Sequence, residues 1–167
     1  VGTRGRIADI VAHDQQRDLA LLKLRDTERG VDRIAYMLPK DEYPKLGQTV
    51  WAVGAGLGYP PSMTSGEMAF AEQVINGYRY QLATAPIIFG NSGGALFAYS
   101  DVRKHYEMIG VPSRVSAAGF QAVTHMGWSI PIETVHTFLK DNFHGFIVGD
   151  KYLKPENRKH KESKNDK

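Results

Sequence analysis

Apolar residues occur along this 167-residue chain in short runs that turn-forming residues separate. Runs of this length, rich in β-branched and aromatic residues, are typical of β-strands, and many of them in succession favour a sandwich or a barrel. Asn76-Gly77 stands between two of the runs and is a strong signal for a hairpin turn. We therefore predict an all-β fold. The expected strands are residues 5–12, 19–24, 49–53, 67–74, 78–84, 95–99, 106–111 and 117–124.

The sequence predicts one helix, near its C-terminal end. Pro131 is suited to the first turn of a helix, because that turn does not use the backbone N–H that proline lacks. The apolar residues that follow recur at the helical period and would share one face. Gly145 is expected to end the helix. The residues on that face are Ile132, Val135, Phe138 and Leu139.

The net charge of +3 comes from 21 Lys or Arg and 18 Asp or Glu residues, and its location matters more than its size. Residues 151–167 hold seven Lys or Arg against three Asp or Glu, which leaves 14 basic and 15 acidic residues in 1–150. A phosphate-binding face needs a basic cluster of its own, so we expect no nucleic-acid partner for the body of the protein. Residues 150–167 have almost no apolar side chains, and we predict a basic, disordered tail.

Composition excludes several chemistries. The chain has no cysteine, so it can form no disulfide, no thiolate nucleophile and no cysteine-ligated zinc site. No apolar run approaches the roughly 18 residues that cross a bilayer, and we expect no membrane span. We expect neither a metal nor a cofactor.

One serine lies among glycines in the segment Gly90-Asn91-Ser92-Gly93-Gly94. A serine hydroxyl is a weak nucleophile at neutral pH, so catalysis requires a base and donors for the oxyanion. Flanking glycines allow backbone angles that point consecutive N–H groups into one small space. The segment is therefore typical of a nucleophile with its own oxyanion hole, although a glycine-rich turn between strands has the same pattern.

The same segment matches the Gly-x-Ser-x-Gly elbow of α/β-hydrolases. That elbow requires a helix after the serine, in a sheet that alternates with helices. Here strand-like sequence follows Ser92, and only one helix is predicted in the chain. The pattern of elements therefore argues against an α/β-hydrolase.

A carboxylate far upstream supports a catalytic interpretation of the serine. Asp18 leads directly into the apolar run 19–24, and a carboxylate at the rim of a buried strand can orient a histidine in a Ser-His-Asp triad. Together, Asp18-Leu-Ala-Leu-Leu-Lys and Gly90-Asn-Ser-Gly-Gly resemble the trypsin-like serine peptidases, most closely the HtrA/Deg branch. The resemblance covers about residues 5–143. It includes two further stretches in the family's order, 46–66 with Gly54, Gly56, Gly58 and Gly66, and Gly127-Trp-Ser-Ile-Pro-Ile132.

The resemblance implies a chymotrypsin-like double β-barrel with a C-terminal helix. We expect residues 1–58 to form the remainder of the N-terminal barrel, and residues 59–149 to form the C-terminal barrel and its helix. The glycine- and proline-rich loop 54–62 would then cross between the barrels. The first barrel would lack its N-terminal strands, so we expect the chain to be N-terminally incomplete.

The resemblance also implies the roles of individual residues. Ser92 would attack the scissile carbonyl, Asp18 would orient the histidine, and the N–H groups of Gly90 and Ser92 would stabilise the oxyanion. The walls of the substrate pocket carry no charge, which favours a small or medium aliphatic residue before the cut. These walls are Ile87, Ile88, Phe89, Gly127, Trp128 and Ser129.

The triad of the family also needs a histidine before the aspartate. His13 is the only histidine upstream of Asp18, and it falls in a turn where the family has no catalytic group. Of the histidines after the serine, only His125, which precedes the pocket strand, is a candidate cleft residue. We therefore expect the catalytic histidine to lie upstream of this chain, and the chain alone to be inactive.

The function implied is that of a serine endopeptidase acting on unfolded or extended polypeptides. The family resemblance also suggests a homo-oligomer and an extracytoplasmic location, either periplasmic or secreted. A second interpretation is a non-catalytic peptide-binding module derived from such a peptidase, which would hold its peptide by strand addition.

Overall fold

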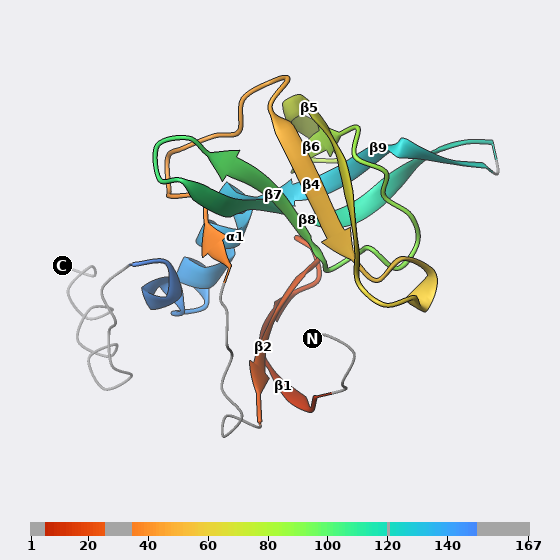
Figure 1. The fold of residues 1–167 in the computed structure, drawn as a ribbon. Coiled ribbons are helices and arrows are strands. Elements are labelled where there is room, and N and C mark those ends of the chain that lie inside the picture. Colours follow the sequence, from red (N-terminus) through yellow and green to blue (C-terminus); the bar gives the residue numbers. More distant parts are fainter. Residues whose placement is uncertain (1–5, 26–34, 120, 150–167) are drawn as a thin grey trace, which may run out of the picture.

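A computed structural model describes residues 6–25, 35–119 and 121–149, and it confirms the predicted all-β fold with a C-terminal helix (Figure 1). The predicted tail 150–167 lies outside the described residues. The first elements are β1 (Ala8–Asp14), β2 (Leu19–Leu24), β3 (Tyr36–Met37), β4 (Thr49–Gly54), the short 3-10 helix η1 (Gly56–Gly58) and β5 (Ser62–Ile75). The later elements are β6 (Tyr78–Ala83), β7 (Ala95–Ser100), β8 (His105–Ala118), β9 (Gln121–Pro131), α1 (Ile132–Asp141) and η2 (Gly145–Val148).

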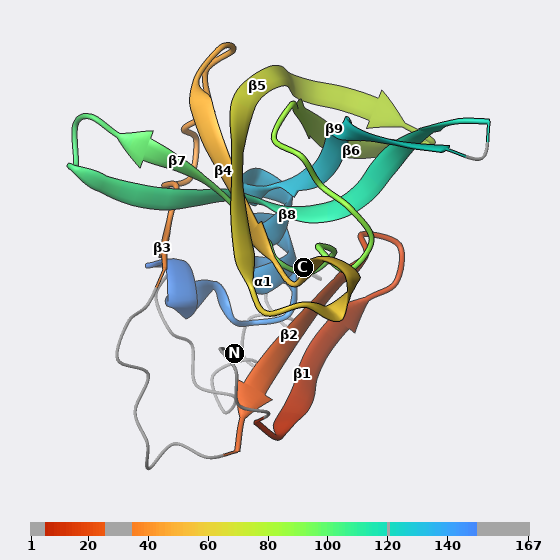
Figure 2. The ribbon, with the colours of Figure 1, turned by 45° about the vertical axis from the view of Figure 1, so that its right-hand side comes forward.

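Six strands close into a barrel. Hydrogen-bonded neighbours run in the order β8-β7-β4-β5-β6-β9, and β9 pairs with β8 to complete the ring (Figure 2). The ring can close because β8 is long: residues 105–110 pair with β7, and residues 110–118 pair with β9. The two-residue strand β3 adds to β8 in parallel.

The barrel interior is apolar because alternate residues of each strand point inward. Val50, Leu96 and Ile109 from β4, β7 and β8 are almost completely buried there. Helix α1 lies beneath the barrel, and its predicted apolar face is the face that is buried (Figure 1). The barrel and α1 together share one apolar core.

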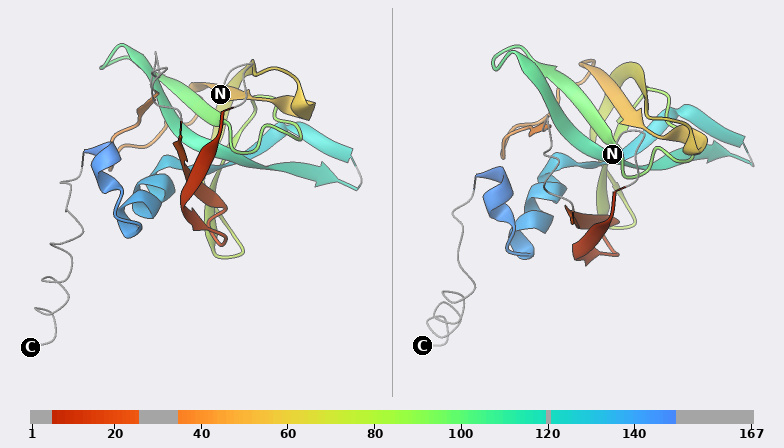
Figure 3. Two further views of the ribbon diagram at one scale, coloured as in Figure 1. Left: turned by 90° about the horizontal axis from the view of Figure 1, so that it is seen from below. Right: turned by 60° about the horizontal axis from the view of Figure 1, so that its bottom comes forward.

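Strands β1 and β2 form a separate two-stranded antiparallel sheet beside the barrel (Figure 3). Leu19 is buried, but Ile7, Ile10 and Leu22 keep between 57% and 68% of their surface exposed. A two-stranded sheet covers only one side of its strands, so this hairpin presents apolar surface to solvent.

Three local predictions were wrong. The loop 54–62 does not cross between sheets: it joins β4 to β5, which are paired neighbours in one sheet, and the change of sheet falls between β2 and β3. Its glycines and prolines signalled a loop correctly but could not show which strands that loop connects. The expected strand 117–124 is instead the end of one long hairpin, in which β8 and β9 meet near Gly119 (Figure 3).

The predicted end of the helix was also wrong. α1 ends at Asp141, because the backbone N–H and the side chain of Asn142 both donate to the carbonyl of Phe138 and close the last turn. Gly145 belongs to η2 instead. In the part of the chain that the structure describes, no helix has the length and apolar character to cross a membrane.

Candidate active site

The serine loop, residues 84–94, connects β6 to β7 and is held by its own asparagine. Asn91 is buried, and its side-chain oxygen accepts a hydrogen bond from the N–H of Ile88 at 3.1 Å. The N–H of Asn91 donates to the carbonyl of Ile88, and the N–H of Gly94 donates to the carbonyl of Asn91. These bonds form a compact turn that presents the next residue, Ser92, at the surface.

The β4–β5 connection packs directly against this turn. A Cβ atom placed on Gly54 would lie 2.7 Å from the side-chain nitrogen and 3.0 Å from the Cα of Asn91, so a side chain at this position would force the turn to shift. Gly90 has φ +97°, and a Cβ there would lie 2.6 Å from the carbonyl oxygen of Ala55. Close packing therefore favours glycine on both sides of the contact, and at Gly90 the positive φ favours it as well.

Ser92 has an exposed side chain whose hydroxyl donates to the carbonyl of Ser113 at 3.2 Å. The N–H of Gly93 donates to the carbonyl of Pro112, so the serine loop is tied to β8 at two adjacent residues. Within the described ranges, the N–H groups of Gly90 and Ser92 donate no hydrogen bond. They are the two groups that the resemblance assigned to the oxyanion hole.

Asp18 lies immediately before β2 and has φ +55°, a left-handed conformation that aspartate tolerates better than most residues. One of its carboxylate oxygens accepts a hydrogen bond from the hydroxyl of Ser113 at 2.6 Å. Ser113 therefore contacts both predicted catalytic residues, Asp18 through its hydroxyl and Ser92 through its carbonyl. The structure thus brings Asp18 and Ser92 together, although Asp18 precedes a strand of the small sheet and Ser92 lies in a loop of the barrel.

Ser113 was not predicted from the sequence. Its only signal was a hydroxyl residue within a long strand, and Ser116 in the same strand has that feature without contacting Asp18 or Ser92. The role of Ser113 depends on the packing of the β1–β2 sheet against β8, which no local pattern reports.

The described histidines do not supply a base to this pair. His13 and His125 are both exposed, and neither hydrogen-bonds to Ser92 or Asp18. The other three are bonded elsewhere: His105 to Glu107, His136 to the carbonyl of Leu38, and His144 to the carbonyl of Asn142. His160 lies outside the described residues.

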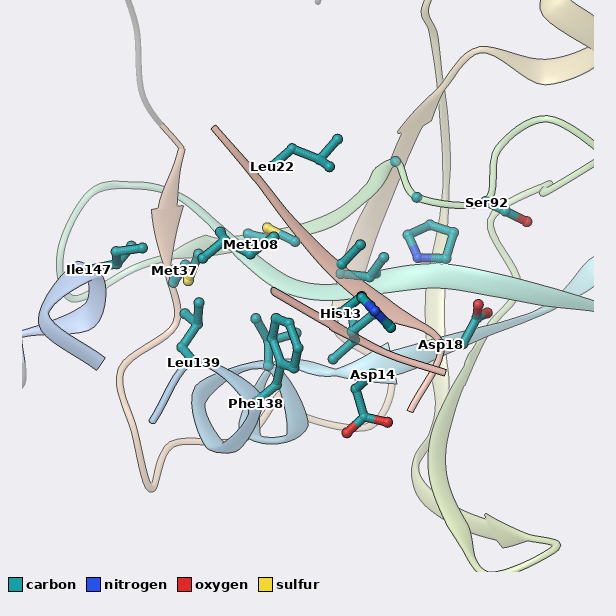
Figure 4. A pocket seen from close by; sticks show the side chains of 18 of the residues that line it. His13, Asp14, Asp18, Leu22, Met37, Ser92, Met108, Phe138, Leu139 and Ile147 are labelled. Carbon is teal, nitrogen blue, oxygen red and sulfur yellow. The ribbon is translucent and has the colours of Figure 1, made fainter. Parts of the chain in front are cut away.

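A cavity of about 650 Å³ opens between the β1–β2 sheet, β8 and α1. Figure 4 shows Asp18 and Ser92 at one end of this cavity, with apolar side chains such as Leu139 and Ile147 at the other. His13 also lines it (Figure 4). Among the described residues, no group of three or more His, Asp or Glu side chains is arranged to hold a metal ion.

The predicted pocket residues lie in different environments. Ile87 is buried against Gly127, where a Cβ on the glycine would meet the isoleucine side chain. Ile88 lies instead against Gly56, and the side chain of Phe89 is 70% exposed. The structure therefore brings Ile87 to Gly127 but turns its two successors away from it.

The two residues after Gly127 alternate in direction along β9. Trp128 is half-buried and donates its indole N–H to the hydroxyl of Ser116 at 2.8 Å. Ser129 is fully buried and lies opposite Gln81 of β6, and within the described part of the chain neither its hydroxyl nor the Gln81 side-chain oxygen has a hydrogen-bond partner. Ser129 therefore faces the barrel core, as expected from the two-residue period of a strand.

Residues 2–104 match the family model described as trypsin-like peptidase domain, which is more than half of the chain. The chain belongs to this family. A related protein of Pseudomonas fluorescens, a probable periplasmic serine endoprotease described as DegP-like, is 30% identical over 131 residues, covering 75% of this chain and 25% of the relative.

Solved structures agree with this assignment. The HtrA-type protease AlgW with a decapeptide matches 85% of this chain and 42% of its own, with a TM-score of 0.67 and 25% identity. An alanine variant of that protease with a tripeptide matches 88% of this chain and 45% of its own, with the same TM-score and 22% identity, and supports the fold alone. This trypsin-like chain thus spans a quarter to less than half of the relatives it matches, and its fold is that of the HtrA proteases.

Proposed function

We propose that this trypsin-like chain is the serine-bearing part of an HtrA-like endopeptidase, which hydrolyses peptide bonds of unfolded or extended polypeptides. Ser92 is the nucleophile, Asp18 orients the base, and the N–H groups of Gly90 and Ser92 stabilise the oxyanion. The observation that carries the proposal is the double contact of Ser113, which joins the Asp18 carboxylate to the Ser92 hydroxyl. The reaction needs no metal and no cofactor.

The base in this proposal is a histidine other than the five described. An imidazole must accept the proton of Ser92 while its second nitrogen donates to a carboxylate. Asp18 offers such a carboxylate, held by Ser113 on the same side of the cavity as Ser92. None of the described histidines makes either bond.

The substrate would bind as an additional strand. Residues 111–118 of β8 pair with β9 on one side, whereas β7 pairs with β8 only as far as Gly110. The open side lies next to Ser92, because the carbonyls of Pro112 and Ser113 accept hydrogen bonds from the serine loop. An extended peptide could therefore pair with this edge through its backbone. Such pairing does not depend on the sequence of the peptide.

The pocket for the residue before the cut would be small and apolar. Ile87 fills the space beside Gly127, and neither wall carries a charge. Each buried methylene contributes about 0.8 kcal/mol, so small or medium aliphatic side chains are favoured over Lys or Arg. Cleavage-site profiling on a denatured protein should show this preference, and strict cutting after Lys or Arg would contradict it.

The second candidate function is peptide binding without catalysis. It is favoured by one observation: the Ser92 hydroxyl donates to a backbone carbonyl, and no described imidazole accepts from it. The location would be extracytoplasmic, as the name of the DegP-like relative suggests, and a homo-oligomer is proposed from the family resemblance.

A fluorophosphonate probe separates the two functions. The probe reacts with an activated serine, so the protein with its histidine in place should be labelled, and the Ser92→Ala variant should not. Binding of a fluorescent unfolded peptide is measured on the same samples. Peptide binding without Ser92-dependent labelling would support the binding module and overturn the peptidase.

A further inference from the structure

The β4–β5 connection makes one backbone hydrogen bond to the serine loop. The N–H of Leu57, in η1, donates to the carbonyl oxygen of Phe89 at 2.7 Å. Phe89 immediately precedes Gly90, so its carbonyl and the N–H of Gly90 belong to one peptide group. The described chain contains no cis peptide bond, and in a trans peptide the C=O and N–H point in opposite directions.

The backbone conformation of Leu57 is explained by this hydrogen bond and not by the packing of its side chain. Leu57 has φ +54°, a left-handed conformation that is unfavourable for leucine, and its side chain is 66% exposed. Left-handed residues outside glycine persist only where the surroundings impose them, and they gather at functional sites. Here the imposed conformation accompanies an N–H directed at the serine loop rather than a buried side chain.

The opposite side of the contact is equally constrained. Gly90 lies so close to the connection that a Cβ would be 2.8 Å from the Leu57 nitrogen and 2.6 Å from the Ala55 oxygen. With the Phe89 carbonyl bonded to Leu57, the N–H of Gly90 points away from the connection and donates to none of the described residues. A flip of this peptide would exchange that donor for an acceptor.

We propose that Leu57 is a positioning residue for the oxyanion hole: its N–H holds the Phe89–Gly90 peptide in the one orientation that leaves the Gly90 N–H available to an oxyanion. The assignment of an oxyanion hole rests on the proposed function. The orientation of the peptide does not, and it can be measured without turnover.

The first test uses the unaltered chain. Amide hydrogen exchange followed by NMR should be at least tenfold slower at Leu57 than at Phe89, whose N–H has no described partner. Equal exchange at the two amides would overturn the proposal. This measurement needs no variant, so its result does not depend on whether a substituted chain folds.

The second test removes the single donor. Replacing Leu57 with its α-hydroxy acid analogue turns the amide into an ester and deletes only the N–H. The same replacement at Gly58 deletes an N–H that donates to the carbonyl of Ala55, inside the β4–β5 connection. The residual dipolar coupling of the Gly90 N–H should change in the ester at 57 and stay unchanged in the ester at 58. Leu57→Gly keeps the N–H and should leave this coupling unchanged. An unchanged Gly90 coupling in the ester at 57 would overturn the proposal.

A peptide ending in a boronic acid then tests the oxyanion hole itself, in the protein with its histidine in place. The serine oxygen adds to boron, its proton passes to the histidine, and the resulting boronate anion resembles the transition state. The ester at 57 should bind this probe at least tenfold more weakly, with binding of the matching carboxamide peptide changed less than twofold. Equal boronate affinity in the two esters would overturn the role of Leu57 in the oxyanion hole. If the Gly90 peptide reorients but no variant binds boronate, the positioning by Leu57 stands and the peptidase function fails.

Discussion

At the scale of single residues, the site depends on contacts that cross between two sheets. Ser113 on β8 reaches Asp18 at the start of β2, and Asp18 adopts a left-handed conformation there. Each residue alone is an ordinary polar residue on a strand or in a turn. Their pairing is what turns a carboxylate and a serine into a candidate catalytic site.

The Ser113–Asp18 bond should be measurable as a coupling free energy. A hydrogen bond to a charged group contributes about 1.5–3 kcal/mol when buried, and Asp18 is exposed, so we expect a coupling of about 1 kcal/mol. Chemical unfolding of Ser113→Ala, Asp18→Asn and the double variant gives this value as a double-mutant cycle. Additive effects of the two substitutions would show that the bond contributes nothing to stability.

Two glycines of the serine loop form a matched pair. Gly90 and Gly93 both have positive φ, but a Cβ on Gly90 would meet Ala55, whereas a Cβ on Gly93 has nothing within 4 Å. Gly93→Ala should therefore cost only the backbone strain, about 1 kcal/mol, and Gly90→Ala should cost about 1–3 kcal/mol more because of overpacking. Urea unfolding of the two variants compares them directly. An equal loss of unfolding free energy in the two variants would mean that the β4–β5 connection can shift to accommodate the added Cβ.

At the scale of elements, β8 organises the molecule because it pairs with β3, β7 and β9. It also carries a buried carboxylate, Glu107, which bonds to Arg103, and Arg103 bonds in turn to Glu42 at 2.8 Å. His105 lies 3.1 Å from the same carboxylate. This cluster anchors the loop before β4 to the start of β8.

The cluster should make stability depend on pH in the acid range. The hydrogen bonds from Arg103 lower the pKa of Glu107 below its ordinary value of 4.5. A lowered folded-state pKa means that the stabilisation is fully present above pH 4.5 and is lost as the pH falls through the folded-state pKa. In thermal unfolding, the stability of the parent should therefore fall more steeply below pH 4.5 than the stability of Glu107→Gln.

The control for this prediction is Glu133→Gln, which removes a partly exposed carboxylate bonded to Arg79. It should keep the acid dependence of the parent, because exposed ion pairs contribute little. At neutral pH we expect Glu107→Gln to cost about 1–3 kcal/mol, since it leaves Arg103 with a weaker acceptor. Parallel pH profiles for the parent and Glu107→Gln would contradict the role of the cluster.

At the scale of the whole molecule, the chain joins a closed barrel to a separate two-stranded sheet with exposed apolar residues. The candidate site lies where these two parts meet, at one end of the 650 Å³ cavity (Figure 4). Both parts contribute a residue to it, but the described histidines contribute none. The site therefore needs both parts of the chain, together with a histidine that the described residues do not supply.

We predict that the 167-residue chain alone does not hydrolyse casein at a rate that depends on Ser92. Triad residues act as a unit, and removing the histidine costs on the order of 10⁶-fold in the best-studied case. His13→Ala and His125→Ala should leave the residual rate unchanged. If this chain cleaves casein and His13→Ala or His125→Ala abolishes the cleavage, that histidine is the base and the prediction is wrong.

The sequence by itself determined the fold class, most strands, the apolar face of α1 and the presence of a serine loop. These features depend on short-range patterns: periods of two and 3.6 residues, a hairpin dipeptide, and glycines around Ser92. The family resemblance came from the same short segments. Each of these signals is complete within a few neighbouring residues, which is why the sequence was sufficient for them.

Only the tertiary structure decided which strands the loop 54–62 joins, that β8 continues past residue 111, and that Ser113 contacts Asp18. It also separated Ile87, which lies against Gly127, from Phe89, which is exposed. The physical reason is that register, ring closure and the docking of one sheet on another are set by contacts between residues far apart in the chain. A local pattern contains no information about such partners. The proposed role of Leu57 likewise depends on a distant residue, Phe89.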